Sequence, residues 1–169
     1  SCTHTLTIVI PALNEEEAVG GTVRACLEAI PQIKQESGVC DVELIVVNDG
    51  STDRTGEIVR AFENVRLIEF ERNRGYGAAL MEGFRQGSGS YVAFLDADGT
   101  CDPRMFGELT RTAIEEHADV VLGSRLGPES QMPAVRRLGN HLFAILLGLL
   151  CGKSISDTAS GMRVIRREA

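Results

Sequence analysis

The alternation of short apolar runs with segments of helical periodicity constrains the fold of this chain more than any other feature. Five runs are short and rich in β-branched residues, as strands are, and they cover residues 6–10, 43–47, 65–68, 91–95 and 120–122. Helical spacing of apolar residues separates the first four runs. The sequence therefore predicts an α/β fold with a mostly parallel sheet and helices on both faces. Ligands of such folds bind at the carboxyl ends of the strands.

Local signals predict where the helices begin and end. Asn14, followed by the acidic residues 15–17, is expected to cap the first helix, and Pro31 is expected to end it. Asp53 is expected to cap the second helix, and residues 79–84 carry the apolar spacing of a third. Each of these helices opens directly after a loop that follows a strand.

Composition fits one globular domain over residues 1–169, with 43% hydrophobic and 24% charged residues. A net charge of -7 argues against a nucleic-acid partner, because affinity for a phosphate backbone comes from clustered Lys and Arg. The five cysteines are odd in number and widely spaced, which suits a reducing compartment better than a disulfide framework. We assign them no ligand role. The first residues do not predict a signal peptide.

Two carboxylates stand where the fourth apolar run ends. Asp96 and Asp98 follow residues 91–95 directly, so they are expected at the point where a buried strand becomes a loop. Mg²⁺ and Mn²⁺ prefer such oxygens and commonly share their remaining ligands with a pyrophosphate. The alternative interpretation is a polar turn after a strand.

Three other loops are expected at the same edge of the sheet. Residues 11–15 and 48–53 each follow a strand and open a helix, where a carboxylate can accept hydrogen bonds from a nucleobase or ribose. Residues 72–79 place small residues where a backbone can approach a ligand. A capped turn between strand and helix explains residues 48–53 equally well.

Segments 8–15, 46–53, 73–77 and 94–98, taken in order, closely resemble the family-2 glycosyltransferases of GT-A fold, which use nucleotide-sugar donors. The resemblance covers nearly the whole chain. It implies that Asp96 and Asp98 are catalytic and handle a metal ion and the pyrophosphate. It also implies a donor pocket formed by Pro11, Leu13, Glu15, Val47, Asp49 and Ala97. Thr100 stands where the closest branch often has Gln, and as a shorter metal ligand it is expected to reach the ion through water.

The second half is similar to the polyprenyl-phosphate glycosyltransferases, the dolichyl-phosphate mannose synthase group and its bacterial relatives. Residues 123–125, 136–140 and 157–163 carry this similarity. It implies that Arg125 takes part in catalysis and that the acceptor phosphate is bound by Arg136, Asn140 and Arg163. The alternatives are a solvated helix start at Arg136 and a surface ion pair at Arg163.

The chemistry of the acceptor gives a separate argument. A sugar hydroxyl ordinarily needs a general base, whereas a phosphate monoester is already largely ionised near neutral pH. The three histidines, His4, His117 and His141, sit in unrelated contexts, and none is expected to be catalytic. The family resemblance implies inversion at the anomeric carbon.

Residues 138–151 are the most apolar stretch of the chain. As a helix they would span about 21 Å, less than the roughly 30 Å of a bilayer core. They are expected to be buried, to form a subunit contact, or to lie at a membrane surface. Residues 127–133 before them have the composition of a loop able to close over substrate.

The end of the chain predicts a C-terminal truncation, because residues 162–165 begin a strand-like run shortly before the last residue. The nucleotide-sugar part is expected over about residues 1–101 and an incomplete acceptor part over 102–169. The leading hypothesis is a glycosyltransferase, peripheral at the cytoplasmic membrane face, that transfers a hexose from a UDP- or GDP-linked donor to a polyprenyl phosphate. The alternatives are transfer to a hydroxyl acceptor and a non-catalytic nucleotide-sugar-binding domain. A homo-oligomer stays open.

Overall fold

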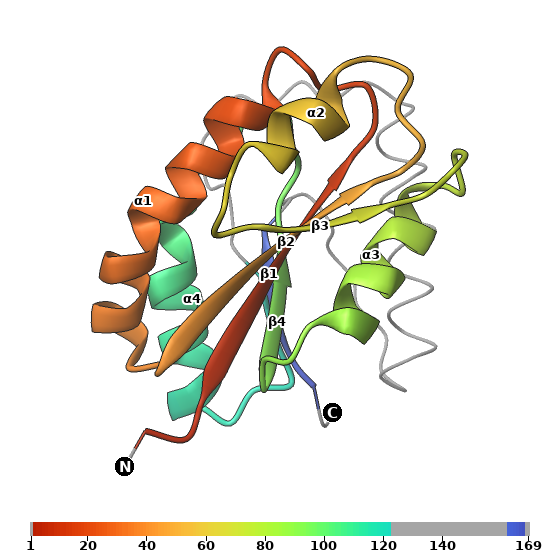
Figure 1. Ribbon diagram of the computed structural model, residues 1–169. Helices are drawn as coiled ribbons and strands as arrows, with labels where there is room; N and C mark the ends of the chain where they lie inside the picture. The colour runs from red at the N-terminus through yellow and green to blue at the C-terminus, as the bar shows by residue number, and fades with distance from the viewer. Residues whose placement is uncertain (1, 123–161, 168–169) are drawn as a thin grey trace, which may run out of the picture.

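The computed structural model describes residues 2–122 and 162–167 and shows the predicted alternation of strands and helices (Figure 1). The described strands form one sheet in the order β3-β2-β1-β4-β6-β5. Strands β3, β2, β1 and β4 are parallel, and β6 runs antiparallel to both β4 and β5. In chain order the elements are β1 (Thr5–Ala12), α1 (Val19–Ser37), β2 (Asp41–Asn48), α2 (Thr55–Arg60), β3 (Arg66–Glu69), α3 (Tyr76–Gln86), β4 (Tyr91–Phe94), α4 (Met105–Glu115), β5 (Val120–Leu122) and β6 (Arg163–Arg166).

Helices cover both faces of the sheet because alternate strand residues point to opposite sides. Leu6, Ile8 and Ile10 of β1 are fully buried in the core that also contains the apolar faces of α1, α2 and α4. Val9 of β1 faces the other way and packs in a second core with Leu80 of α3. Figure 1 shows α1 and α4 on one side of the sheet and α3 on the other. The predicted fold class is therefore confirmed.

The five predicted strands are all present, and the strand-like run at residues 162–165 becomes β6. Helix α4, which lies beside α1 (Figure 1), was not predicted. Its buried side chains are Phe106, Gly107, Leu109, Thr110 and Ala113.

Two predictions about α1 were wrong. Asn14 does not cap it, because Asn14 adopts a left-handed backbone (φ 52°) and the helix begins at Val19 after a turn. Pro31 does not end it, although its missing N–H cannot bond to the preceding turn. The helix continues to bury Ile33 and stops at Gly38, whose left-handed backbone (φ 75°) lets its N–H bond to the carbonyl of Lys34.

The cysteine prediction is also corrected. Cys2 and Cys40 form a disulfide, while Cys26 and Cys101 keep their thiol groups. The two partners are 38 residues apart in sequence, but Cys2 lies three residues before β1 and Cys40 directly before β2, and these strands pair from Thr5 and Asp41 onward. Sequence spacing carries no sign of this proximity, so the cysteine pattern gives no support for a reducing compartment.

Some predictions concern residues outside the described ranges: Arg125, Arg136, Asn140, the loop 127–133 and the apolar stretch 138–151. Within the described ranges, none of the helices combines the length and the apolar character needed to cross a membrane.

Candidate active site at the carboxyl edge of the sheet

The loops that follow the parallel strands meet at one edge of the sheet. We name them loop 1 (residues 13–18), loop 2 (49–54), loop 3 (70–75) and loop 4 (95–104). Backbone hydrogen bonds carry the sheet pairing into loops 2, 3 and 4: Asp49 N to Ala12 O (2.9 Å), Phe70 N to Asn48 O (2.9 Å) and Leu95 N to Val9 O (3.2 Å). The predicted convergence of these loops is thus present.

Loops 1 and 2 are joined by hydrogen bonds that pair side chains of one with backbone groups of the other. Asn14 N–H donates to Ser51 Oγ, and Thr52 N–H donates back to Asn14 Oδ1, both at 2.9 Å. The N–H of Glu16 donates to Asp53 Oδ2 at 3.1 Å, and the N–H of Arg54 donates to Glu16 Oε2 at 3.1 Å. The polar residues of loop 1 therefore fix loop 2 instead of capping α1.

Asp53 was predicted to cap α2, but the N-cap position is Arg54, one residue later, and the Asp53 carboxylate instead links Thr55 of the first turn to loop 1. Its Oδ1 accepts hydrogen bonds from the backbone and the hydroxyl of Thr55, at 2.9 and 2.6 Å. Desolvation raises the pKa of Asp53, but these bonds and the one from Glu16 outweigh it and lower the pKa below its usual value. Asp53 therefore stays ionised as a fixed link between α2 and loop 1.

Loop 2 is packed directly against loop 3. Gly50 has a left-handed backbone (φ 70°), and a Cβ at this position would lie 2.3 Å from the carbonyl carbon of Arg72. Only glycine fits both the conformation and the contact.

Asp49 stabilises loop 3 from the end of β2. It is only 3% exposed, and its Oδ1 and Oδ2 accept the N–H groups of Arg74 (2.7 Å) and Gly75 (2.9 Å). The predicted contact between Asp49 and a nucleoside stays a prediction, but the structure shows the carboxylate engaged with loop 3.

Asp96 and Asp98 are both half-buried in loop 4. The hydroxyl of Tyr76 donates to Asp96 Oδ1 at 2.8 Å. The hydroxyl and the N–H of Thr100 both donate to Asp98 Oδ1, at 2.7 and 3.0 Å. Thr100 was predicted as a water-mediated metal ligand; that stays a prediction, and the structure shows its hydroxyl on Asp98.

Tyr76 keeps its proton beside Asp96. Desolvation around the hydroxyl raises its pKa, and the adjacent Asp96 carboxylate raises it further. The residue as a whole is 45% exposed, so it is the hydroxyl end that is crowded. The phenol is accordingly a hydrogen-bond donor at physiological pH.

Arg163 is buried close to Tyr76, whose hydroxyl donates to Asp96. It is 2% exposed, pairs in register with Phe94 at the end of β4, and places its guanidinium carbon 5.9 Å from the centroid of the Phe94 ring. Its positive charge lowers the pKa of Tyr76, opposing the larger effect of burial, so the three groups share one electrostatic environment. The alternative interpretation of Arg163 as a surface ion pair is therefore wrong, and its role at an acceptor phosphate stays a prediction.

The other residues predicted to bind the nucleotide sugar differ in how exposed they are. Pro11 and Val47 lie within strands and are buried, whereas Leu13 is 39% exposed and Glu15 is half-buried in loop 1. Ala97 is buried, and its carbonyl accepts a hydrogen bond from Thr22 of α1 at 2.9 Å. Their contacts to a donor stay predictions.

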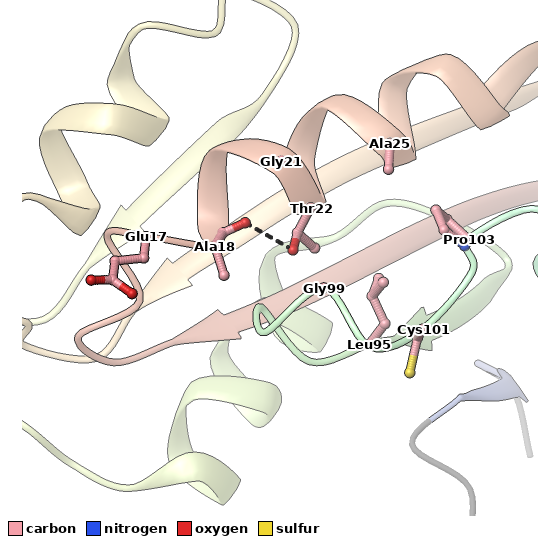
Figure 2. Close-up of a pocket in the computed structure, with 9 residues that line it drawn as sticks. All are labelled: Glu17, Ala18, Gly21, Thr22, Ala25, Leu95, Gly99, Cys101 and Pro103. Atoms are coloured by element: carbon pink, nitrogen blue, oxygen red, sulfur yellow. Dashed lines mark hydrogen bonds between the residues drawn. The ribbon is translucent and has the colours of Figure 1, made fainter.

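A cavity of about 300 Å³ lies between the first turns of α1 and loop 4 (Figure 2). Its lining consists of Glu17, Ala18, Gly21, Thr22, Ala25, Leu95, Gly99, Cys101 and Pro103. Neither carboxylate of the Asp pair lines it, so we do not assign the donor to this cavity.

The carboxylate oxygens of loop 4 are suitable ligands for a hard divalent cation. Asp96 and Asp98 offer carboxylate oxygens, which Mg²⁺ and Mn²⁺ prefer. In residues 2–122 and 162–167 no group of three or more His, Cys, Asp or Glu side chains could complete a metal cage. Such a pair suits an ion that takes its remaining ligands from a diphosphate.

Two residues that hold this arrangement, Tyr76 and Thr22, were not predicted. Tyr76 was noted only as part of a glycine-containing segment, and Thr22 was not considered. The one available signal was that Tyr76 opens a helix directly after the loop of β3, which places it at the same edge as Asp96.

Curated relatives resemble almost the whole of this chain. The low-salt glycan biosynthesis hexosyltransferase Agl6 of Haloferax volcanii is 36% identical over 98% of the chain, which spans 39% of that protein. The dolichyl-phosphate beta-glucosyltransferase ALG5C of Trichomonas vaginalis is 33% identical over 96% of the chain, which spans 52% of that protein. The chain thus spans about half the length, or less, of these two relatives.

The fold also matches a solved structure. Glucosyl-3-phosphoglycerate synthase from Mycobacterium tuberculosis, crystallised with Mn²⁺, UDP and phosphoglyceric acid, superposes with a TM-score of 0.64 at 27% identity. The match covers 98% of this chain and 56% of that one. The family model described as glycosyl transferase family 2 matches residues 7–169, and the chain therefore belongs to glycosyl transferase family 2.

Proposed function

We propose that this chain is the catalytic part of a metal-dependent glycosyltransferase that transfers a hexose from a UDP- or GDP-linked donor to a polyprenyl phosphate, with inversion. The observation that carries the proposal is the Asp96 and Asp98 pair at the edge where loops 1 to 4 meet, with a hydroxyl donor on each carboxylate. The same edge is where ligands of this fold class bind.

Asp96 and Asp98 would hold Mg²⁺ or Mn²⁺ together with the donor diphosphate. The bound ion supplies charge neutralisation of the departing nucleoside diphosphate. The Mn²⁺ and UDP in the similar synthase from Mycobacterium tuberculosis support this assignment. In loop 1, exposed Leu13 and half-buried Glu15 are assigned to the nucleoside by family resemblance.

The positions of His4 and His117 support a phosphate acceptor. His4 packs edge-on against Tyr91 at the amino end of β4, and His117 follows the last turn of α4. Among the described residues, then, neither of these histidines stands beside the Asp pair as a general base for a hydroxyl nucleophile. A phosphate monoester needs none, because it is already ionised near neutral pH.

Arginine side chains would bind and orient the acceptor phosphate. Buried Arg163 is close enough to Tyr76, the residue bonded to Asp96, to lower the pKa of the phenol. Arg125, Arg136 and Asn140 are assigned to the phosphates by family resemblance. Bidentate guanidinium contacts would fix both the geometry and the charge of the attacking group. The dolichyl-phosphate relative supports a lipid acceptor, and with such an acceptor the reaction would take place at a membrane surface.

The test is a turnover assay with UDP- and GDP-sugars, Mg²⁺ or Mn²⁺, and a short polyprenyl phosphate, followed by mass spectrometry of the lipid. We expect a lipid-linked hexose that forms only when the cation is present. Turnover that is equally fast in chelator would refute the metal requirement. Cation-dependent donor binding without transfer to any acceptor would instead indicate a nucleotide-sugar-binding domain.

Transfer to a hydroxyl acceptor is the second candidate. It is favoured by the similarity to a synthase whose structure contains phosphoglyceric acid beside Mn²⁺ and UDP. Glycerate phosphates and simple saccharides therefore belong in the same assay. Product on these acceptors but not on the polyprenyl phosphate would replace the leading proposal.

A further inference from the structure

Each carboxylate of the Asp pair accepts a hydrogen bond from one side-chain hydroxyl, and the two hydroxyls come from different elements. Tyr76, the first residue of α3, reaches Asp96 Oδ1 at 2.8 Å. Thr100, in loop 4 itself, reaches Asp98 Oδ1 at 2.7 Å. The terminal torsion of an Asp side chain is broad, so a hydrogen bond from a fixed group decides how the carboxylate is presented.

Tyr76 is itself fixed from a third element. Buried Asp49, at the end of β2, accepts the N–H groups of Arg74 and Gly75, the two residues directly before Tyr76. A continuous set of contacts therefore runs from β2 through loop 3 to Asp96. The orientation of Asp96 depends on this set as well as on its own loop.

We propose that Tyr76 and Thr100 are positioning residues that hold Asp96 and Asp98 in the arrangement that binds a divalent cation together with a nucleoside diphosphate. The inference rests on the proposed function and deepens it. In this proposal Thr100 orients the metal ligand Asp98, whereas the sequence predicted Thr100 itself as a metal ligand. Hydroxyl groups that hold metal-binding carboxylates act through the ligands, and their loss typically lowers metal affinity 10- to 100-fold, as an order of magnitude.

The first test is calorimetric titration of Mn²⁺ into the full chain, with UDP or GDP present at a saturating concentration. Tyr76→Phe keeps the ring and removes the hydroxyl, so we expect Mn²⁺ affinity to fall by about 10- to 100-fold. Tyr91→Phe is the matched control, because Tyr91 is the other of the two tyrosines and lies at the far end of β4. It should change Mn²⁺ affinity by less than about 2-fold, because Tyr91 is far from the Asp pair and substitutions at distant sites act independently.

The second test uses rescue at Thr100. Thr100→Val removes the hydroxyl but leaves the backbone N–H that also donates to Asp98 Oδ1 at 3.0 Å. We therefore expect a smaller loss than at Tyr76, about 10-fold or less. Thr100→Ser keeps the hydroxyl and should restore Mn²⁺ affinity. If the serine variant binds Mn²⁺ as weakly as the valine variant, the positioning role of Thr100 is wrong.

A third readout is tyrosine fluorescence, measured with UDP or GDP present as in the calorimetric titration. The chain has no tryptophan, so in Tyr91→Phe all tyrosine emission comes from Tyr76. Paramagnetic Mn²⁺ bound at Asp96 should quench this emission in a saturable manner, and diamagnetic Mg²⁺ should compete with the quenching. Adding Asp96→Asn should abolish the effect. Emission unaffected by Mn²⁺ concentrations that saturate the calorimetric signal would contradict the contact between Tyr76 and the cation site.

The failure of the inference differs from that of the proposed function. Wild-type affinity in Tyr76→Phe, in a protein that does bind Mn²⁺ with UDP or GDP, overturns the positioning role alone. If the wild-type chain shows no cation-assisted uptake of either nucleotide, the proposed function fails and the inference falls with it.

Discussion

At the scale of single residues, substitution of Asp98 tests the proposed metal-binding role of loop 4 separately from its role in the fold. Asp98→Asn keeps an oxygen that can accept hydrogen bonds from Thr100, so the fold should survive. It removes the negative charge that a cation requires. We expect Mn²⁺-dependent nucleotide binding and turnover to fall by at least about 100-fold, with an unchanged circular dichroism spectrum.

Asp102→Asn is the control for this prediction. Asp102 lies in the same loop but forms an exposed ion pair with Arg104. Its substitution should leave binding and turnover near the wild-type values, because exposed ion pairs contribute little. Equal losses in the Asp98 and Asp102 variants would show that loop 4 responds to any change of charge, and would remove the specific metal role of Asp98.

Gly50 and Gly38 test the contact between loops 2 and 3. Both have left-handed backbones, but a Cβ on Gly38 meets nothing within 4 Å, whereas one on Gly50 meets the backbone of loop 3 at 2.3 Å. Gly38→Ala should cost about 1–2 kcal/mol of unfolding free energy, from backbone conformation alone. Gly50→Ala should cost clearly more and should also weaken nucleotide binding. Equal costs in urea denaturation would mean that loops 2 and 3 separate easily.

At the scale of elements, the strands could be predicted from the sequence and the ends of α1 could not. The apolar runs are unambiguous because both faces of the sheet are covered by helices. Pro31 inside a helix costs about 3 kcal/mol or more, whereas burying one large side chain such as Ile33 contributes about 1.5–3 kcal/mol. Helix α1 therefore continues past Pro31 because the side chains after it pack in the core. Local sequence signals do not reveal this packing.

The last turn of α3 gives a pH-dependent prediction. Hydrogen bonds from Arg85 and Gln86 lower the pKa of Glu82 from 4.5 to about 2. Because the folded pKa is depressed, this stabilisation is complete above the unfolded pKa and is lost as the pH falls from about 4.5 towards 2. Glu82→Gln should therefore flatten the decline of stability in that interval. Thermal melts across the interval with the same slope in both proteins would contradict the shift.

At the scale of the whole molecule, the placement of Asp96 and Asp98 at the carboxyl edge of the sheet was predictable, and the residues that contact them from other elements were not. Asp96 and Asp98 could be found because they follow an apolar run directly. Tyr76 could not be paired with Asp96, because α3 follows β3, and β3 is separated from β4 by β2 and β1 in the sheet. The disulfide could not be predicted for the same reason, because Cys2 and Cys40 are brought together only by the pairing of β1 with β2.

The disulfide joins the amino ends of β1 and β2, at the edge opposite the Asp pair. For cysteines 38 residues apart, loop closure predicts up to about 4 kcal/mol of stabilisation, so Cys2→Ser should lower the unfolding free energy by about 2–4 kcal/mol. Mn²⁺-dependent nucleotide binding should not change. Reductant should destabilise the wild type to the same extent and leave the variant unaffected. A wild type insensitive to reductant would show that the bond adds no stability.

The reciprocal hydrogen bonds between loops 1 and 2 limit how this edge can be re-engineered. Asn14, Glu16, Ser51 and Asp53 each satisfy a backbone group in the other loop. A chimera that imports loop 1 alone from another enzyme would leave amides of loop 2 without acceptors, and the reverse exchange would do the same to loop 1. Loops 1 and 2 are therefore best exchanged together, as one unit.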